Sequence, residues 1–146
     1  MTTQPLHDTG EEYTIKNGLS GTYTVALFED GELSGSGDNL NDSSDIGDIT
    51  TEPGGSNYAQ QSATFSVADL SGDWGIQNDS LIEFNTLDSS RDVDAVALIV
   101  NFQSADKGDS SANDHLLGTT TLTQTRNLSD YSSIDYAAGD LTLKIT

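Results

Sequence analysis

The sequence contains no cysteine, which excludes disulfide bonds, thiolate metal sites and cysteine nucleophiles together. Basic residues are nearly as scarce, with 5 lysines and arginines against 24 acidic residues and a formal net charge of −19. Without a basic patch to neutralise phosphates, nucleic acid is not an expected partner. No run approaches the roughly 18 to 20 apolar residues of a membrane span, so membrane insertion is not expected either.

The excess of acidic residues indicates the environment in which the chain works. At low ionic strength such a surface repels itself, whereas at 1 M salt the Debye length falls to about 3 Å and the charges are screened. The composition therefore favours a halophilic protein. An acidic, disordered chain is the competing interpretation, and the regular alternation of the apolar residues argues against it.

Alternating apolar residues, separated by Gly, Asn, Asp and Ser, predict β-strands. The expected strands lie in EEYTIKN (11–17), GTYTVALFED (21–30), SATFSVADL (62–70), SLIEFNTL (80–87), DAVALIVNFQS (94–104), LLGTTTLTQTRNL (116–128) and DLTLKIT (140–146). The segment 94–104 is apolar on both faces and is expected to be a central, doubly covered strand. A turn is expected at EDGE (29–32), where Gly31 can take a positive φ.

These patterns predict an all-β protein: a single antiparallel, jelly-roll-like β-sandwich of about seven to nine short strands. The sandwich domain is expected over residues 13–146, after a flexible N-terminal arm over residues 1–12. Helical signals are weak, because no segment carries an apolar stripe over three turns. One helical turn is expected in SSANDHLLG (110–118), capped by Ser110 or Ser111.

Catalytic motifs are missing from the sequence. There is no GxSxG elbow and no GxxxxGK[ST] or GxGxxG phosphate loop. His7 falls in the expected arm, which leaves His115 as the one candidate base. We expect His115 to be a loop or surface residue, since its neighbour Asp114 cannot face it along a strand or helix. Among 24 acids, a carboxylate pair arises by chance and does not indicate glycoside hydrolysis. The sequence predicts a non-enzymatic protein without a cofactor.

The acidic segment DNLNDSSDIGDITTEP (38–53) suggests a calcium loop. It fails the helix-loop-helix calcium template. Counting from Asp38, the third position is Leu40; counting from Asp42, Gly47 fits the sixth position but Pro53 occupies the twelfth. Two alternatives remain for this segment.

The first alternative is an irregular Ca²⁺ or Mg²⁺ site formed by Asp42, Asp45 and Asp48. The second is a long solvated loop, part of an irregular stretch that runs from residue 31 to residue 56. A second acidic segment, SADKGDSSANDH (104–115), offers the same two alternatives through its acids, Asp106, Asp109 and Asp114.

The end of this loop forms a motif of its own, composed of Ile49, Glu52, Pro53, Gly55 and Tyr58. Proline fixes its own φ and extends the residue before it, and glycine permits a sharp turn. The tyrosine then supplies an aromatic anchor at the start of the next strand. We expect the motif to close the long loop onto the sheet, a structural role and not a ligand contact.

Several of these segments together resemble a group of small β-sandwich structural proteins of tailed viruses. They are VALF (25–28), the Asp-rich loop, ITTEP (49–53), YAQQ (58–61), DAVALIVNFQS and AGDLTLKIT. The resemblance runs from Tyr23 to Thr146 and departs at Gln60, where the group often has Arg. With the acidic composition, it implies a virion component of a haloarchaeal tailed virus, a capsid decoration or vertex (turret) protein. The implied partners are further copies of the chain and the major capsid protein or other virion proteins.

Two alternatives to this function remain. One is a tail component of the virus. The other is a carbohydrate- or calcium-binding module in contact with the host surface, with Tyr58, Trp74, Tyr131 and Tyr136 as sugar platforms. The N-terminus MTTQPLHDTGEEY lacks the basic start and apolar core of a secretory signal. Assembly in the host cytoplasm and location in the virion are therefore expected.

Overall fold

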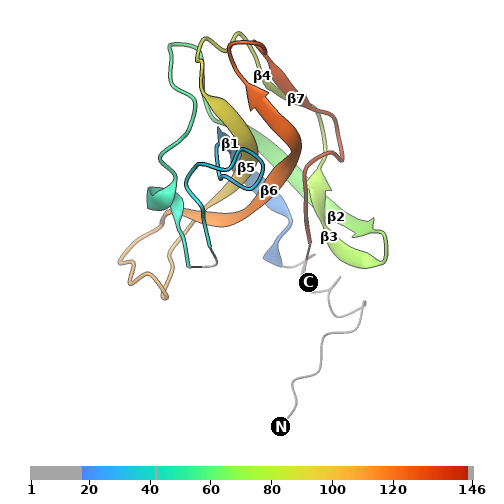
Figure 1. Cartoon of the computed structure of the whole chain (residues 1–146). Coiled ribbons are helices and arrows are strands. Elements are labelled where there is room, and N and C mark those ends of the chain that lie inside the picture. Colours follow the sequence, from blue (N-terminus) through green and yellow to red (C-terminus); the bar gives the residue numbers. More distant parts are fainter. Residues whose placement is uncertain (1–17, 42, 145–146) are drawn as a thin grey trace.

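The computed structural model describes residues 18–41 and 43–144, and within them the chain forms eight strands and one 3₁₀ turn (Figure 1). The strands are β1 (Gly21–Phe28), β2 (Gln61–Leu70), β3 (Asp73–Asn78), β4 (Ile82–Phe84), β5 (Asp92–Phe102), β6 (Asn113–Asn127), β7 (Ile134–Tyr136) and β8 (Thr142–Lys144), and the 3₁₀ turn η1 is Ile46–Asp48. The predicted all-β, antiparallel, sandwich-like fold is confirmed. The expected arm (1–12) and the expected strand at 11–17 lie outside the described residues.

The strands divide unequally between two sheets. Six strands form one antiparallel sheet in the order β6-β5-β1-β2-β3-β8, and β4 pairs with β7 in a small second sheet. The large sheet curls until its two edge strands, β6 and β8, come into contact. At this contact the Thr120 hydroxyl on β6 donates to the carbonyl of Thr142 on β8 at 3.0 Å. In Figure 1 the small sheet lies at one end of this curled sheet. Within the described ranges, no helix is long and apolar enough to cross a membrane.

Alternation along β1 sends side chains into two separate apolar clusters. Val25 and Leu27 enter the main core, which the curled sheet encloses together with β4 and β7. Ala26 and Phe28 enter a second core on the opposite face of the sheet. The predicted central strand, β5, lies between β6 and β1, and its residues 93–99 are all buried. Burial on both faces explains its nearly continuous apolar sequence.

The second core is covered by a connection rather than by a sheet. Residues 29–60, which join β1 to β2, are called here the long loop. Three of its side chains, Leu40, Ile46 and Ile49, pack on the second core. The predicted turn after β1 is confirmed, since Gly31 has a φ of 106°. The long loop is therefore a wall of the fold, and how it is held decides the geometry of this face.

The helical turn predicted at residues 110–118 is wrong. Residues Asn113 onward extend as β6 and pair with β5, with His115 opposite Val100. The local capping signal of Ser110 and Ser111 is overridden by this pairing, because a ladder along a buried central strand recruits the neighbouring segment into the sheet.

Candidate functional site: the long loop and its carboxylate anchors

The first anchor of the long loop is Asp94 on β5, whose side chain is 0% exposed. Its carboxylate accepts the backbone N–H groups of Asp30, Gly31, Leu33 and Ser34 at 2.6, 3.1, 3.2 and 3.2 Å. Successive N–H groups that converge in this way form a concave anion site, and here the chain's own carboxylate occupies it. Burial raises the pKa of Asp94, but the backbone hydrogen bonds outweigh burial and hold the pKa below its ordinary value.

The second anchor, Asp38, joins the two ends of the long loop. Its carboxylate accepts the Thr50 hydroxyl at 2.6 Å, the Thr51 hydroxyl at 2.8 Å and the Thr50 backbone N–H at 3.0 Å. The Thr51 hydroxyl also accepts the N–H of Glu29, directly after β1, at 2.9 Å. Burial raises the pKa of Asp38, and these hydrogen bonds more than offset it. Asp38 is partly exposed, as expected of a solvated loop, but it is also tied to Thr50 and Thr51, 12 and 13 residues along the chain.

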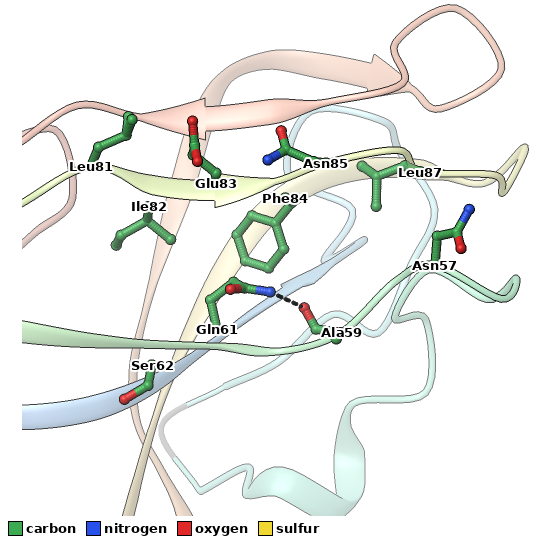
Figure 2. A pocket seen from close by; sticks show the side chains of 10 residues that line it. All are labelled: Asn57, Ala59, Gln61, Ser62, Leu81, Ile82, Glu83, Phe84, Asn85 and Leu87. Carbon is green, nitrogen blue, oxygen red and sulfur yellow. Dashed lines mark hydrogen bonds between the residues drawn. The ribbon is translucent and has the colours of Figure 1, made fainter.

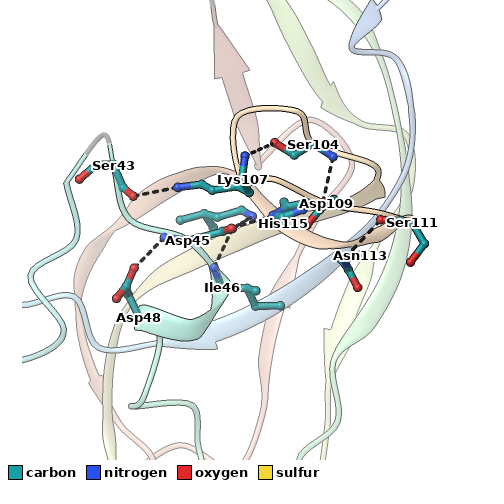
Figure 3. Close-up of polar contacts among 11 residues, drawn as sticks. Ser43, Asp45, Ile46, Asp48, Ser104, Lys107, Asp109, Ser111, Asn113 and His115 are labelled. Atoms are coloured by element: carbon teal, nitrogen blue, oxygen red, sulfur yellow. Dashed lines mark hydrogen bonds and ion pairs between the residues drawn. The ribbon is translucent and has the colours of Figure 1, made fainter.

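The third anchor is a clamp around His115, whose side chain is only 9% exposed (Figure 3). Its Nδ1 lies 2.7 Å from Asp45 Oδ2 in the long loop, and its Nε2 lies 2.5 Å from Asp109 Oδ2 in the loop between β5 and β6. Hydrogen bonds to Asp45 and then to Asp109 raise the pKa of His115. The expectation that His115 is a loop or surface residue is wrong: it is a buried strand residue held between two carboxylates.

Asp45 also organises the backbone around it. Its Oδ1 accepts the N–H of Ile46 and the N–H of Leu116, both at 2.8 Å. Burial raises the pKa of Asp45, but the hydrogen bonds from Leu116 and His115 outweigh burial and lower it to about 2. Because β6 is an edge strand of the large sheet, the bond to Leu116 occupies a donor that an edge leaves open to pairing with other chains.

The clamp rests on further contacts from both of its loops. Asp48 Oδ2 accepts the N–H of Asp45 at 2.8 Å and completes the cap of η1. The Lys107 ammonium donates to the Ser43 carbonyl at 3.3 Å, which links the loop between β5 and β6 to the long loop. Phe102 packs edge-on against the His115 ring, with the ring centroids 5.2 Å apart.

These contacts bear on the chemistry that His115 can perform. Each of its ring nitrogens faces a carboxylate oxygen, so the favoured form is the doubly protonated imidazolium, which donates both ways. An imidazolium in this position has no lone pair with which to accept a proton from a substrate. The clamp is an arrangement that joins three segments of the fold.

The predicted cation site at Asp42, Asp45 and Asp48 is not assembled by the part of the chain that can be described. Asp42 lies outside that part, while Asp45 and Asp48 direct oxygens to the hydrogen bonds of the clamp and of η1. Among residues 18–41 and 43–144, no group of three His, Cys, Asp or Glu side chains is arranged to hold a metal ion. A site that includes Asp42 stays a prediction.

The acids of the second acidic segment do not gather either. Asp109 contacts His115, as above. Asp114 accepts the amide of Asn101 on the neighbouring strand at 2.9 Å, and Asp106 is exposed. Each of the three carboxylates thus has its own surroundings.

The motif after η1 closes the long loop onto the sheet. The Tyr58 hydroxyl donates to Glu52 Oε1 at 2.7 Å and accepts the N–H of Leu27 on β1 at 3.0 Å. The ring of Tyr58 stacks on Phe84, with centroids 6.1 Å apart and an interplanar angle of 11°. Burial and the Glu52 carboxylate raise the pKa of Tyr58, which keeps its hydroxyl protonated as a donor.

The remaining motif residues also serve the closure. Ile49 packs on the second core, and Pro53 is buried. Gly55 has a φ of 91°, and a Cβ at this position would lie 2.3 Å from Asp88 Oδ1. Asp88 approaches so closely because it accepts the backbone N–H of the next residue, Ser56, at 3.0 Å.

A cavity of about 400 Å³ lies beside this closure, between the start of β2 and β4 (Figure 2). Ile82 and Phe84 project from β4 toward the segment at Ala59 and Gln61. On the β2 side of the cavity, the Gln61 amide donates to the Ala59 carbonyl at 3.0 Å. The lining is mainly polar at the surface and holds one acid, Glu83.

Of the four aromatic residues predicted as sugar platforms, two come together. Tyr131 and Tyr136 line a second cavity, between β6 and β7. Tyr58 is committed to the loop closure, and Trp74 is half-buried on β3, packed against the main core.

Comparison of the chain with protein-family models, with curated protein sequences and with solved structures gives no match.

Proposed function

We propose that this chain is a non-enzymatic structural protein of a haloarchaeal tailed virus, a capsid decoration or vertex (turret) protein that forms homo-oligomers and stabilises the particle in high salt. One observation carries the proposal. One segment within the resemblance, from Ile49 to Tyr58, closes the long loop onto the sheet through the hydrogen bonds of Tyr58 with Glu52 and Leu27. This part of the resemblance falls on a fold-forming element.

The anchors of the long loop favour a structural role. Asp38, Asp45 and Asp94 direct their oxygens to backbone and side-chain donors of the same chain. His115, the candidate base, is engaged by carboxylates on both sides. A protein with this excess of acidic residues is suited to a virus particle in concentrated salt, because the salt screens the repulsion between its charges.

Self-association has a candidate surface at the small sheet. β4 and β7 pair only with each other within the described part of the chain, so each leaves one edge without a strand partner. Leu81, directly before β4, is 53% exposed. Open strand edges beside an exposed apolar side chain favour contact with another chain, and identical copies using such a surface form closed, symmetric oligomers.

The oligomer is tested by light scattering on the purified chain in multimolar KCl. We expect a discrete oligomer for the wild type and a lower mass for Leu81→Glu. The matched control is Leu33→Glu, at an exposed leucine of the long loop, which should leave the mass unchanged. A monomer at every protein concentration contradicts the homo-oligomer.

The location is tested by immunogold labelling of particles purified from a host culture that produces this chain. Label on the capsid shell or its vertices supports the proposal, and label confined to the tail supports the tail alternative. Particles that carry no label contradict a virion role.

A further inference from the structure

The cavity between β6 and β7 combines features that none of the loop anchors explains. Its volume is about 530 Å³, larger than that of the cavity beside the loop closure. Its walls come from the last part of β6, from β7 and from the segment leading to β8. Hydroxyl and amide side chains line much of it, among them Thr121, Thr123, Gln124 and Ser133, and its lining also holds two acids, Asp135 and Asp140.

Arg126 is the unusual group in this cavity. The chain has 24 acids and only 5 lysines and arginines, yet Arg126 makes no ion pair with any carboxylate of the described ranges. It is held by neutral groups instead. With the Gln124 amide oriented so that its oxygen faces the guanidinium, that oxygen accepts from Nη2 at 2.9 Å, and the Tyr131 ring lies under the guanidinium, 4.9 Å from Cζ to the centroid.

Neutral neighbours hold the guanidinium in place without neutralising it. A guanidinium presents N–H donors in a planar fork that matches the two oxygens of a carboxylate. Stacking on an aromatic ring fixes the plane of that fork. The arrangement suits an anionic group that arrives from outside the chain.

The two tyrosines add an apolar face and a free polar group. Tyr131 is 44% exposed, so part of its side chain is open to a ligand. The Tyr136 hydroxyl is buried and has no hydrogen-bond partner within the described part of the chain. A buried polar group without a partner is unfavourable, and such groups occur where a ligand or water completes the bonding.

The backbone of β6 is irregular where it presents these groups. In the pairing of β5 with β6, Val93 lies opposite Arg126 and Ala95 opposite Thr121. Four residues of β6, 122–125, are therefore inserted against the single residue 94 of β5. Bulges of this kind re-aim side chains beside binding sites, and this one immediately precedes Arg126.

We propose that this cavity binds a carboxylated sugar residue of a glycan, with the carboxylate on Arg126, the sugar ring against Tyr131 and a sugar hydroxyl on Tyr136. A sugar ring offers C–H groups to an aromatic face and hydroxyls to the threonine and amide side chains. The carboxylate matches the unpaired guanidinium. The cavity shares β7 with the proposed self-association surface, but Leu81 does not line it, so Leu81→Glu tests self-association and Arg126→Gln tests the cavity independently.

The test is calorimetric titration of the full chain in multimolar KCl with two matched disaccharides. Cellobiuronic acid carries the carboxylate and cellobiose does not. We expect the acid to bind and cellobiose to bind at least about tenfold more weakly, because one charged hydrogen-bonded pair is worth roughly a factor of ten. Absence of binding by the acid, or equal binding of both sugars, overturns the proposal.

Variants locate the site. Arg126→Gln should weaken binding of the acid by about tenfold or more, and Arg91→Gln, at an exposed arginine outside the cavity, should not change it. Arg126→Lys keeps the charge but loses the planar fork, so it should bind between wild type and Arg126→Gln. In the wild type, cellobiuronic acid should change the NMR chemical shifts of the backbone amides and rings of Tyr131 and Tyr136. This measurement locates the site without relying on the folding of any variant. Unchanged binding by Arg126→Gln, or shifts confined to another surface, contradicts the assignment.

Discussion

The backbone N–H of Asp30 donates to Asp94 Oδ1 at 2.6 Å, across 64 residues of sequence. This contact joins the first residues of the long loop to the most buried strand of the sheet. It shows how the acidic residues act in this fold. From the composition alone, these carboxylates would be expected at the surface. Several of them instead accept hydrogen bonds that hold the long loop in place, and the loop forms the wall of the second core.

Asp94→Asn should lower the free energy of unfolding by about 2–4 kcal/mol. The substitution keeps the shape of the side chain but replaces one acceptor oxygen by a donor, which then faces backbone N–H groups of the long loop. Chemical denaturation in high salt measures the change. Asp106→Asn removes the same charge from an exposed position and should change stability by less than about 0.5 kcal/mol. Equal effects of the two substitutions would show that charge, and not the hydrogen bonds, matters.

Gly55→Ala should destabilise the protein by about 1–3 kcal/mol, because alanine is strained at a φ of 91°. Its Cβ would also displace the Asp88 carboxylate. Gly54→Ala is the matched control, since a Cβ at Gly54 meets no atom within 4 Å. Thermal melts of the two variants decide the point, and a Gly55→Ala melt as high as that of Gly54→Ala would refute this geometry.

Tyr58→Phe should cost about 1–2 kcal/mol of stability. The ring stack on Phe84 survives this substitution, but the Leu27 N–H and the Glu52 carboxylate both lose the hydroxyl. The control is Gln60→Ala, which removes an exposed partner of the same carboxylate and should change stability by less than about 0.5 kcal/mol. If Tyr58→Phe unfolds at the denaturant concentration of the wild type, the closure does not depend on the hydroxyl.

The clamp around His115 makes stability depend on pH in two directions. The pKa of His115 is raised above 6.5 in the folded chain, so its contribution is complete below pH 6.5 and is lost as pH rises through the folded value. The pKa of Asp45 is lowered from 3.8 to about 2, so its contribution is complete above pH 3.8 and is lost as pH falls toward 2. The clamp should therefore stabilise most between about pH 4 and 6.5.

Denaturation midpoints measured from pH 5 to pH 9 test this dependence. The wild type should lose stability above pH 6.5, and His115→Gln should be less stable at pH 5 and show little of the alkaline loss. His7→Gln, which removes the other histidine, should retain the wild-type profile. A flat wild-type profile, or an alkaline loss that persists in His115→Gln, would mean that the clamp is not the titrating element.

The strands were predictable from the sequence because their signal is local. Alternation in 21–30 and 62–70 and the doubly apolar run at 94–104 each follow from the sheet face that every second residue occupies. The turn at Gly31 and the sharp bend at Gly55 were likewise marked by residues that tolerate positive φ. The predicted helical turn at 110–118 failed because pairing with β5 outweighs a local cap.

The anchors were not predictable, because their partners lie far apart. Asp45 and His115 are 70 residues apart in the chain, and nothing local distinguishes Asp45 from the other loop acids. The same is true of Asp94, which the sequence marks only as the first residue of an expected strand segment. The one partial signal was chemical: a histidine in a chain so rich in carboxylates has acidic partners available wherever it is buried.

The long loop is anchored by the chain's own carboxylates, and we predict that these anchors hold it without a bound cation. Amide hydrogen exchange, followed by NMR on protein treated with EDTA in multimolar KCl, tests this most directly. The account predicts slow exchange at Gly31, Ser34, Thr50 and Leu116, with no further protection when Ca²⁺ or Mg²⁺ is added. Fast exchange at these amides in EDTA, with protection restored by either cation, would contradict it.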